Sequence, residues 1–462
     1  MSKKLVLAVI DGLTPALLEK GIASGRLPTL TALRDAGEYT RATTTFPSVT
    51  PVCLTSIATG AHPDVHHVPH LVWYHRGEQR LVEYGSSFPA MRAAGARRAL
   101  QDAVFEMTRS HLSRGATTVF EALEDAGLVT AAINFTCYRG RTRHAIRLPE
   151  VMRRNRWFEA VDGPTRFFFF NLFESDPTGA PLAIRSRTRG SIDSYAAVVG
   201  RWLVTRDGFD FLVFYLPDFD YASHAVGPEA AFDALEHADA ALAELLRAAG
   251  GVEDFLERYA IVVCSDHGQT PVEHGVKLGS SLALDGDGVV VAASNRAGMI
   301  YRLPGCPVPA RELAERLDED ASADVVLFRE DGVAAARRDG RELRFAPENG
   351  GWRCEGDVEV LDPGRYPNGF ERAWCALVCP NAGDVLVSAA EGHEFADLGG
   401  SHHAGGGSHG SLLAGDSTVP VILAGLERPS LGDDASVTDI APLVLAHFGV
   451  DTPTSMRAAV HA

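Results

Sequence analysis

Three features are scarce or missing in this 462-residue sequence: long apolar runs, paired-cysteine motifs and an excess of basic side chains. No stretch approaches the ~20 apolar residues of a membrane-spanning helix, so we expect no membrane span. The seven cysteines are odd in number and form no CxxC motif, which fits reduced thiols better than a disulfide framework. Lys and Arg number 43 against 60 Asp and Glu, and the formal net charge of −17 argues against a nucleic-acid scaffold as partner.

The N-terminus also lacks the pattern of a secretion signal. Lys3 and Lys4 precede an apolar run at 5–10, but a run of about six residues is short for a signal peptide, and no small-residue cleavage site follows. We therefore predict a buried first strand here and a cytoplasmic protein. The chain shows no internal repeat and no low-complexity tract.

The sequence does have an ordinary globular composition and many histidines. Apolar residues make up 46% and charged residues 22%, which excludes a disordered chain. At this length we expect one large domain and a smaller one. The 17 histidines in an acidic chain indicate metal binding, because divalent metals use His nitrogens and Asp oxygens as ligands.

Short apolar segments alternate with helical patterns along most of the chain. This alternation is typical of an α/β fold in which helices cover both faces of a mostly parallel sheet. Glycines follow three of the expected helices, and Ser436 is a plausible N-cap of the last one. The expected strands are 5–10, 129–135, 211–216, 260–264 and 419–424, and the expected helices are 27–36, 118–126, 230–249 and 437–448.

Residues 281–385 have a different pattern. Short strand-like segments at 289–293, 325–328 and 343–345 are broken by Gly, Pro, Asp and Asn, and Asp339-Gly340 predicts a hairpin turn. We interpret this region as a smaller inserted α+β cap domain. The core would then comprise 1–280 and 386–462, with a minor insertion at about 75–115.

Carboxylates follow three of the expected strands. Asp11 ends the first strand, Asp220 follows the strand at 211–216, and Asp266 with His267 follows the strand at 260–264. In an open α/β sheet, ligands bind outside the carboxyl ends of the strands. These side chains are therefore expected at one edge of the sheet, where three together are hard to explain as turn formers.

Two further segments carry histidines with metal-ligand spacing. Asp220 and His224 are four residues apart, so a helical turn would place both on one face, where they could grip one ion. A glycine-rich loop before the strand at 419–424 carries His402, His403 and His409. We favour His409 as the ligand and leave open whether His402 and His403 support the site or face solvent.

The segment 43–60 offers a nucleophile. Thr50 and Pro51 occupy the expected N-cap and first position of a short helix that Gly60 ends. A hydroxyl at the positive end of a helix lies where a phosphoryl group would bind, and a metal would lower its pKa. Thr45 and Ser48 are competing hydroxyls.

Together these residues resemble the alkaline phosphatase superfamily, and most closely its nucleotide pyrophosphatase/phosphodiesterase (type I phosphodiesterase) family. The likeness covers about 1–280 and 386–462 and is weak across the expected cap. The matching positions are the strand-terminal Asp11, the FPSVTP loop with Thr50, the D-x-x-x-H-x-x-G-P motif of Asp220, His224, Gly227 and Pro228, the Asp266-His267-Gly268 run and the late His409-Gly410.

The resemblance implies an alkaline-phosphatase-like fold and a two-zinc site. Asp220, His224 and His409 would hold one zinc, and Asp11, Thr50, Asp266 and His267 would hold the other. Manganese or iron remains open, because the same ligands accept them. The implied activity is hydrolysis of a phosphodiester or pyrophosphate bond in a small phosphorylated substrate, with nucleotides among the candidates. Thr50 would attack phosphorus and form a phospho-threonine intermediate.

One motif departs from the family pattern. After the nucleophile helix the family typically runs His-Gly-Ile-x-x-Asn, with the Asn binding a phosphate oxygen, whereas this chain has Leu71 at the Asn position and His67 at the Gly position. The replacement contact could come from His70, from Asn134 or from the arginines at 139, 141 and 143. For the arginines we expect a solvated loop.

Two other functions stay open. A phosphomonoesterase, phosphonate hydrolase or phosphomutase of the same superfamily would share the metal ligands, although a monoesterase would need a further cation for the extra phosphate charge. A metal-binding protein without turnover is the remaining alternative, and an intact nucleophile beside complete ligand sets argues against it.

Overall fold

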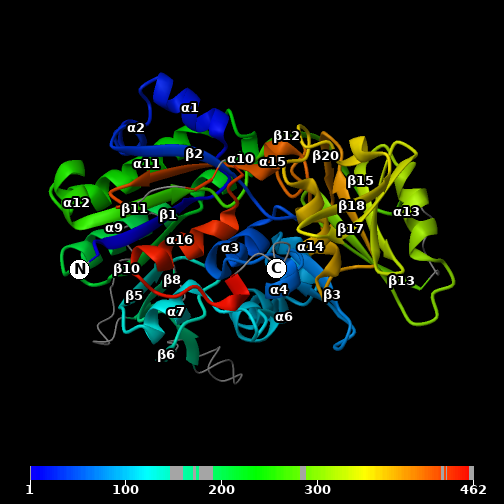
Figure 1. Cartoon of the computed structure of the whole chain (residues 1–462), viewed down its shortest axis with the longest axis horizontal. Helices are drawn as coiled ribbons and strands as arrows, with labels where there is room; N and C mark the ends of the chain where they lie inside the picture. The colour runs from blue at the N-terminus through cyan, green and yellow to red at the C-terminus, as the bar shows by residue number, and fades with distance from the viewer. Residues whose placement is uncertain are drawn as a thin grey trace.

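The computed structural model describes residues 2–145, 160–169, 173–175, 191–280, 288–427, 431–432 and 434–456. Within these residues the chain forms two lobes, each built around one large β-sheet (Figure 1). The larger lobe holds an eight-stranded sheet, and the smaller lobe, at the right of the view, holds a seven-stranded sheet.

The eight-stranded sheet is parallel at its centre, which confirms the expected α/β core. Strands β11, β1, β10, β5 and β8 are parallel neighbours, and antiparallel strands flank them on both sides. The order across the sheet is β2 (Gly37–Thr43), β22 (Thr418–Ala424), β11 (Tyr259–Cys264), β1 (Lys4–Ile10), β10 (Phe211–Leu216), β5 (Thr130–Ile133), β8 (Arg166–Phe169) and β9 (Phe173–Ser175).

Helices cover both faces of this sheet because successive strand side chains point to opposite faces. Leu5, Leu7 and Val9 of β1 pack on one face, and Val6, Ala8 and Ile10 pack on the other. The first face is covered by α3 (Thr50–Thr59), a π-helix (η1, Asp102–His111), α7 (Val119–Asp125), η4 (Val437–Asp439) and α16 (Ile440–His447). The second is covered by α1 (Pro15–Ala23), α2 (Pro28–Asp35), α9 (Ile192–Val204), α11 (Phe232–Arg247) and α12 (Val252–Arg258).

All five expected core strands and all four expected helices are present, with ends shifted by a few residues. The last expected helix divides into a 3-10 turn and α16, and Ser436 caps the turn as expected. The helices α1, α9 and α12 were not expected from the sequence.

The smaller lobe contains an antiparallel sheet, and all of its strands except β19 (Val385–Ala389) come from the middle of the expected cap. Its order is β13 (Val289–Ser294), β14 (Ala297–Arg302), β19, β15 (Ala323–Glu330), β16 (Val333–Arg338), β17 (Arg341–Glu348) and β18 (Gly351–Gly356). Asp339 and Gly340 both have positive φ in the turn between β16 and β17, which confirms the expected hairpin. The cap boundary drawn from the sequence at 385 falls at the start of β19, in the middle of this sheet.

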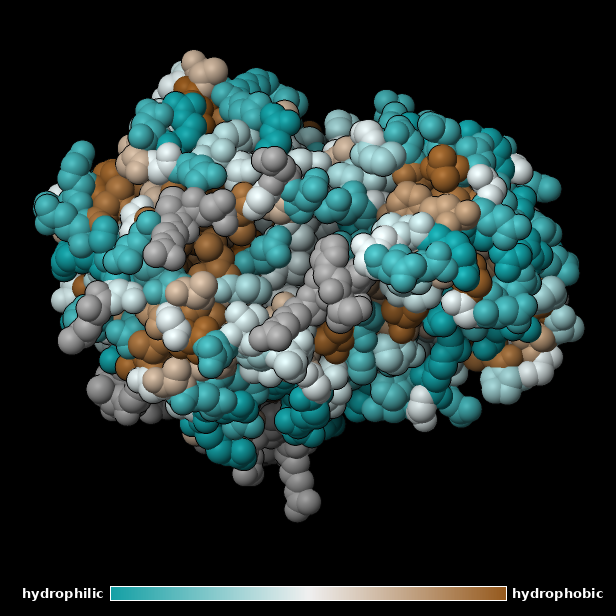
Figure 2. All heavy atoms as spheres, viewed as in Figure 1, coloured by the Kyte–Doolittle hydropathy of each residue, from teal (hydrophilic) through white to brown (hydrophobic). Residues whose placement is uncertain are grey.

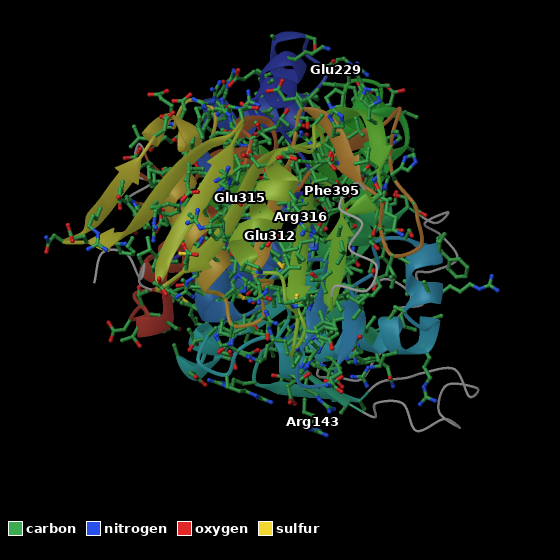
Figure 3. The ribbon with its side chains drawn as sticks, turned by 90° about the vertical axis from the view of Figure 1, so that its right-hand side faces the viewer. Arg143, Glu229, Glu312, Glu315, Arg316 and Phe395 are labelled. Atoms are coloured by element: carbon green, nitrogen blue, oxygen red, sulfur yellow. The ribbon has the colours of Figure 1, made fainter. Side chains whose placement is uncertain are left out.

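Helix α13 (Ala310–Asp318) covers one face of the cap sheet and α14 (Gly369–Val378) covers the other. Leu313, Ala314 and Leu317 form the buried side of α13. Figure 3 shows Glu312, Glu315 and Arg316 on its outer side, so the helix is amphipathic as its position requires. On the face shown in Figure 2, hydrophilic residues cover most of this lobe and hydrophobic residues appear in small separate areas.

Shorter elements complete the fold. The expected insertion at about 75–115 forms the hairpin of β3 (Val72–His75) and β4 (Arg80–Glu83), short helices α5 (Phe88–Ala93) and α6 (Ala96–Gln101), and the π-helix. A small sheet joins β12 (Thr270–Val276), β20 (Gly392–Phe395) and β21 (Gly407–Ser408). The remaining short elements are α4 (Pro63–His66), α10 (Asp218–Val226), α15 (Ala414–Ser417), β6 (Thr142–Ala145), β7 (Ala160–Gly163), η3 (Val358–Leu361) and η5 (Thr454–Met456).

The sequence predicts neither a membrane span nor a disulfide framework. Among them, no helix combines the length and the apolar character needed to cross a bilayer. All seven cysteines lie in the described part of the chain and none is in a disulfide.

A buried ion pair joins the cap sheet to the core. Arg296 lies in the turn between β13 and β14, and its guanidinium contacts both carboxylate oxygens of Asp416 at 2.9 and 3.1 Å. Both side chains are almost fully buried, at 1% and 0% exposure. Arg296 also donates to the carbonyls of Ala390 and His393, and Asp416 accepts from the backbone and hydroxyl of Ser411. The pair therefore fixes the tip of this hairpin against the loop that follows His409.

Replacing Arg296 with Met should destabilise the protein by about 3–5 kcal/mol, because Asp416 would stay buried without its counter-charge. Arg353→Met is a matched control, since Arg353 forms a 3.3 Å pair with Glu348 at the surface of the same sheet and should change stability by less than about 1 kcal/mol. Urea unfolding measures both. Equal losses for the two variants would contradict a structural role for the buried pair.

Candidate functional site

The carboxyl ends of three neighbouring strands bring the predicted aspartates together. Asp11 directly follows β1, Asp220 lies in the first turn of α10 after β10, and Asp266 lies two residues after β11. The strand order β11–β1–β10 makes these ends adjacent. All three side chains are buried, at 2%, 5% and 0% exposure. Asp218, the other carboxylate after β10, instead accepts hydrogen bonds from the first residues of α9.

One group of donor atoms surrounds His267. Its Nε2 lies 3.3 Å from Asp11 Oδ1, 3.4 Å from Asp266 Oδ2 and 3.1 Å from the Thr50 hydroxyl oxygen. The Asp11, Asp266 and His267 donor atoms all lie within 4.8 Å of one another. This set offers one nitrogen and several oxygens to a single cation, a mixture that zinc accepts.

A second group lies beside the first. His224 Nε2 is 3.3 Å from Asp220 Oδ2, as the helical i, i+4 spacing predicts, and His409 Nε2 is 3.7 Å from Asp220 Oδ1. The two Nε2 atoms of His224 and His409 are 3.3 Å apart. The rings of His267 and His409 stack with their centroids 3.6 Å apart, so the two groups form one continuous cluster.

The backbone orients all three of these histidines in the same way. Each Nδ1 lies within hydrogen-bond distance of a carbonyl oxygen: 2.8 Å for His409 to Ser48, 2.8 Å for His224 to Gly407, and 3.1 Å for His267 to Gly268. A carbonyl only accepts, so each Nδ1 donates the hydrogen bond and each Nε2 is the ring nitrogen that faces the cluster. Metal-binding histidines are typically fixed this way.

The glycines of the His409 loop allow its close approach to α10. A Cβ on Gly406 would lie 2.1 Å from the carbonyl oxygen of His224, which no side chain could tolerate. A Cβ on Gly407 would likewise lie too close to its surroundings, 2.7 Å from the side-chain oxygen of Gln269. The glycine-rich composition therefore serves the position of His409 opposite Asp220.

Two buried carboxylate oxygens in the cluster have no hydrogen-bond partner among the described residues. They are Asp11 Oδ1 and Asp266 Oδ2, the oxygens that face His267. The other oxygen of Asp11 accepts from the Tyr215 hydroxyl, and Asp220 Oδ1 accepts from the Gln269 amide. A buried acceptor without a donor costs about 1–3 kcal/mol, so a cation at this position fits what the residues lack.

The electrostatics of the cluster lead to the same conclusion. Burial raises the pKa of Asp11 well above its usual range, and the charges of Asp220 and Asp266 raise it further. Burial likewise raises the pKa of Asp266. At Asp220 burial acts in the same direction, but the neighbouring histidines, His224 foremost, outweigh it and lower the pKa. The donor sets thus fit divalent cations as their missing positive charge.

The predicted capping role of Thr50 is wrong. Helix α3 begins at Thr50, its N-cap is Val49, and no side chain caps it, so Thr50 is the first helical residue and Pro51 the second. The hydroxyl of Thr50 lies beside His267 instead of bonding to its own helix. The competing hydroxyls are engaged elsewhere: Thr45 contacts His62 at 3.2 Å and Ser48 donates to the Ser411 carbonyl at 2.8 Å. Gly60 ends the helix with positive φ, as predicted.

The cluster opens into a cavity of about 310 Å³. Among the described residues, no Lys or Arg lines it. Its lining beyond the donor groups is largely apolar and aromatic, with a few amides and hydroxyls. The lining residues are Asp11, Thr50, Pro51, Leu71, Tyr84, Gly85, Ser86, Ala103, Met107, Asn134, Thr136, Phe169, Ile192, Tyr215, Pro217, Asp220, Tyr221, His224, Asn295, His403 and His409.

The two predicted substrate contacts differ in position. Asn134 lines the cavity with a positive φ of 62°, and its amide nitrogen lies 3.5 Å from the Ile192 carbonyl. His70 is fully buried, does not line the cavity, and contacts the backbone of Val72 at 3.0 Å. Burial lowers the pKa of His70 to about 4. The sequence placed it near Leu71, but its own turn points the ring into the protein.

The arginines at 139, 141 and 143 do not line the cavity either. Arg139 is buried and pairs with Glu121, which corrects the expected solvated loop, and Arg141 pairs with Asp125. Arg143 is exposed as expected and points outward at the lower edge of the molecule in Figure 3. Arg139 and Arg141 thus join the segment before β6 to α7, and Arg143 pairs with Asp162 of β7.

The sequence left open whether His402 and His403 support the site or face solvent, and the structure places the two differently. His403 lines the cavity, stacks on His224 at 4.0 Å and has its Nδ1 2.6 Å from Glu394. His402 is exposed and lies over Gly275.

Three cavity or supporting residues were not found from the sequence: Tyr215, Gln269 and Asn295. Tyr215 sits inside an apolar strand, where nothing distinguishes it from a core residue. Gln269 follows the Asp-His-Gly run and was within reach of motif reasoning. Asn295 belongs to the cap and had no signal, because only the hairpin of β13 and β14 carries it to His409.

Comparisons with known proteins identify a family and a fold. A family model described as type I phosphodiesterase/nucleotide pyrophosphatase matches residues 5–412. The comparison with curated proteins finds no match. Among solved structures, phosphonoacetate hydrolase from Sinorhizobium meliloti, in complex with phosphonoacetate, aligns with a TM-score of 0.60 and 19% identity over 96% of this chain and 95% of that one.

A second similar structure is murine ectonucleotide pyrophosphatase/phosphodiesterase 5, solved as an inactive threonine-to-alanine variant in complex with AMP. It aligns with a TM-score of 0.60 and 14% identity over 97% of this chain and 96% of that one. The human form of that protein aligns with a TM-score of 0.58. At these identities the likeness shows the fold, which is alkaline-phosphatase-like as expected.

Replacing Tyr215 with Phe should weaken divalent-metal binding about 10- to 100-fold, because Asp11 would lose the hydroxyl that orients it. Tyr221→Phe is the matched control, since Tyr221 lines the same cavity but is 61% exposed. Competition with a fluorescent zinc chelator measures both affinities. Indistinguishable affinities for the two variants would contradict an orienting role of Tyr215.

Proposed function

Because this chain belongs to the type I phosphodiesterase/nucleotide pyrophosphatase family, we propose that it is a two-metal hydrolase that cleaves a phosphodiester or pyrophosphate bond through a phospho-threonine intermediate. Membership makes the chain a metal-dependent phosphoric ester hydrolase. The type of bond, the number and identity of the metal ions and the intermediate are the finer parts of the proposal.

One observation supports it above the others. The Thr50 hydroxyl stands at the N-terminus of α3, 3.1 Å from His267 Nε2, beside two carboxylate oxygens that are buried without partners. A threonine that only stabilised the fold would not need a histidine and two unpartnered carboxylate oxygens beside its hydroxyl. The inactive variant of the murine relative also replaces a threonine with alanine, which agrees with a threonine nucleophile in this fold.

The residues that would hold the ions follow from the two groups of donor atoms. Asp11, Asp266, His267 and Thr50 would hold one ion, and Asp220, His224 and His409 would hold the other. Zinc suits the mixture of imidazole and carboxylate, and manganese or iron is not excluded by it. When bound, the ions lower the pKa of the nucleophile and stabilise the negative charge on the phosphoryl oxygens.

Thr50 carries the chemistry. Its Oγ1 attacks phosphorus, the bond from phosphorus to the leaving oxygen breaks, and the threonine proton passes to solvent. Water then attacks the phospho-threonine, breaks the bond between phosphorus and Oγ1 and restores the hydroxyl. Thr50 lies at the N-terminus of α3, where the positive end of the helix dipole favours the developing negative charge.

The lining of the cavity bears on the substrate. A monoester dianion needs a further cation, and no Lys or Arg lines the described part of the cavity. A diester carries one negative charge and fits this lining better. The neighbouring structures contain AMP and phosphonoacetate, so small phosphorylated molecules, including nucleotides, are the class proposed, and a nucleic-acid scaffold is not. The proposal also includes a cytoplasmic location, supported by seven unpaired cysteines.

Replacing Thr50 with Ala should lower turnover by about three orders of magnitude or more while the protein keeps its fold and at least one metal ion. Thr45→Ala tests the competing hydroxyl and should retain turnover. Metal content by mass spectrometry and hydrolysis of bis-p-nitrophenyl phosphate are the measurements. Near-normal turnover by Thr50→Ala would show that the nucleophile is wrongly assigned, and activity that survives prolonged chelation would exclude the metal-dependent reaction.

A substrate panel separates the proposed activity from its alternatives. The metal-loaded enzyme should hydrolyse bis-p-nitrophenyl phosphate faster than p-nitrophenyl phosphate and faster than phosphonoacetate, because a singly charged ester suits the lining. Values of kcat/KM for the three compounds decide the order. Preference for the monoester or the phosphonate would replace the proposed substrate class, and no turnover of any compound would favour a metal-binding protein.

A further inference from the structure

The cap contributes one side chain to the metal cluster. Asn295 lies at the tip of the hairpin of β13 and β14, and its Nδ2 is 3.2 Å from His409 Nε2. The residue is 5% exposed and lines the cavity that holds Thr50. We propose that Asn295 is a substrate-binding residue, whose amide donates a hydrogen bond to a phosphoryl oxygen of the bound substrate.

The amide has a defined orientation. The hydroxyl of Ser294 lies 2.8 Å from Asn295 Oδ1 and donates to it, which turns the Nδ2 donor toward His409. Ser294 is itself only 2% exposed, so solvent does not compete for this bond. An amide nitrogen cannot ligate a cation, and it therefore needs an oxygen or a nitrogen lone pair as its partner.

Asn295 Nδ2 lies beside His409 Nε2, which is the atom that would bind a metal ion. His409 Nδ1 donates to the Ser48 carbonyl, so Nε2 is the acceptor for Asn295 and also the lone pair that faces Asp220 and His224. Once that lone pair is used by an ion, a buried donor is left beside it. An unpaired buried donor is unfavourable, and a substrate oxygen drawn to the same place would satisfy it.

The hairpin tip is held rigidly enough for this role. The amide of Arg296 donates to the His409 carbonyl at 2.8 Å, and the amide of Phe395 donates to the Asn295 carbonyl at 2.8 Å. The buried pair of Arg296 and Asp416 anchors the same turn to the core. A site residue on such a support keeps its geometry when substrate arrives.

A comparison with Asn349 shows that backbone conformation alone does not explain the position of Asn295 beside the cluster. Asn295 has a φ of 55°, a conformation that Asn tolerates better than most residues. Asn349 has a φ of 54° in the turn between β17 and β18 of the same sheet, but it is exposed. The two positions share the turn requirement, and only Asn295 faces the donor cluster. Leu71, which also lines the cavity, offers no donor there.

The test replaces each asparagine with glycine, which keeps a positive φ without strain and removes the side chain with its amide. Asn295→Gly in the metal-loaded enzyme should lower kcat/KM for bis-p-nitrophenyl phosphate about 100-fold, as loss of one donor to a phosphoryl oxygen does. It should also weaken the binding of inorganic phosphate about 10-fold by calorimetry, with the metal content unchanged. Asn295→Asp should weaken phosphate binding at least as much, because it replaces a donor with a negative charge. Asn349→Gly should match wild type.

The inference rests on the proposed function, and the two can fail separately. If wild type hydrolyses none of the esters, the proposed function fails, while phosphate binding by wild type and Asn295→Gly still decides the role of the amide. Equal phosphate binding and kcat/KM for Asn295→Gly and Asn349→Gly would overturn the inference alone. Loss of a metal ion from Asn295→Gly would overturn it as well, because the residue would then support the metal site and not the substrate.

Discussion

The structure is organised around three buried carboxylates that lie together at one edge of a parallel sheet. Asp11, Asp220 and Asp266 could not all be ionised there without positive charge, and the partner that the chain supplies is imidazole, not lysine or arginine. The oxygens of Asp11 and Asp266 that face His267 have no hydrogen-bond donor. Divalent cations would satisfy both conditions at once, so the strand order, the glycine-rich loop and the oriented histidines are best understood as a scaffold for them.

Much of this site could be predicted from the sequence because its residues follow strands. A carboxylate after an apolar run is placed by the sheet itself, and Asp220 with His224 is placed by the period of a helix. The strands of the core were predictable for the same reason, since each buried run is bounded by turn residues. The Thr50 hydroxyl lies beside His267 in the cluster, although the predicted helical position of the residue was wrong by one. That error does not move the hydroxyl, which points to His267 from the first turn of the helix in either case.

Other positions could not be predicted, because the local sequence does not show which way a side chain turns or which distant segment it meets. His70 was expected at the cavity because it is near Leu71 in the chain, but its ring turns inward to the backbone of Val72. Arg139 pairs with Glu121 of α7, and no local sequence pattern indicates this pair. Asn295 is 114 residues from His409 and reaches it only because the cap hairpin docks on the core through Arg296 and Asp416. The contact between this hairpin and the core is therefore the part of the cavity about which the sequence is least informative.

The proposed reaction requires that the cluster of donor atoms holds two divalent ions. Native mass spectrometry of the folded chain, purified and then supplied with zinc or manganese, counts bound ions without reference to any substrate. We predict two ions per chain in the wild type and one after Asp220→Asn, which removes an oxygen donor from only one of the two groups. A folded wild-type chain that retains no divalent ion would contradict the account.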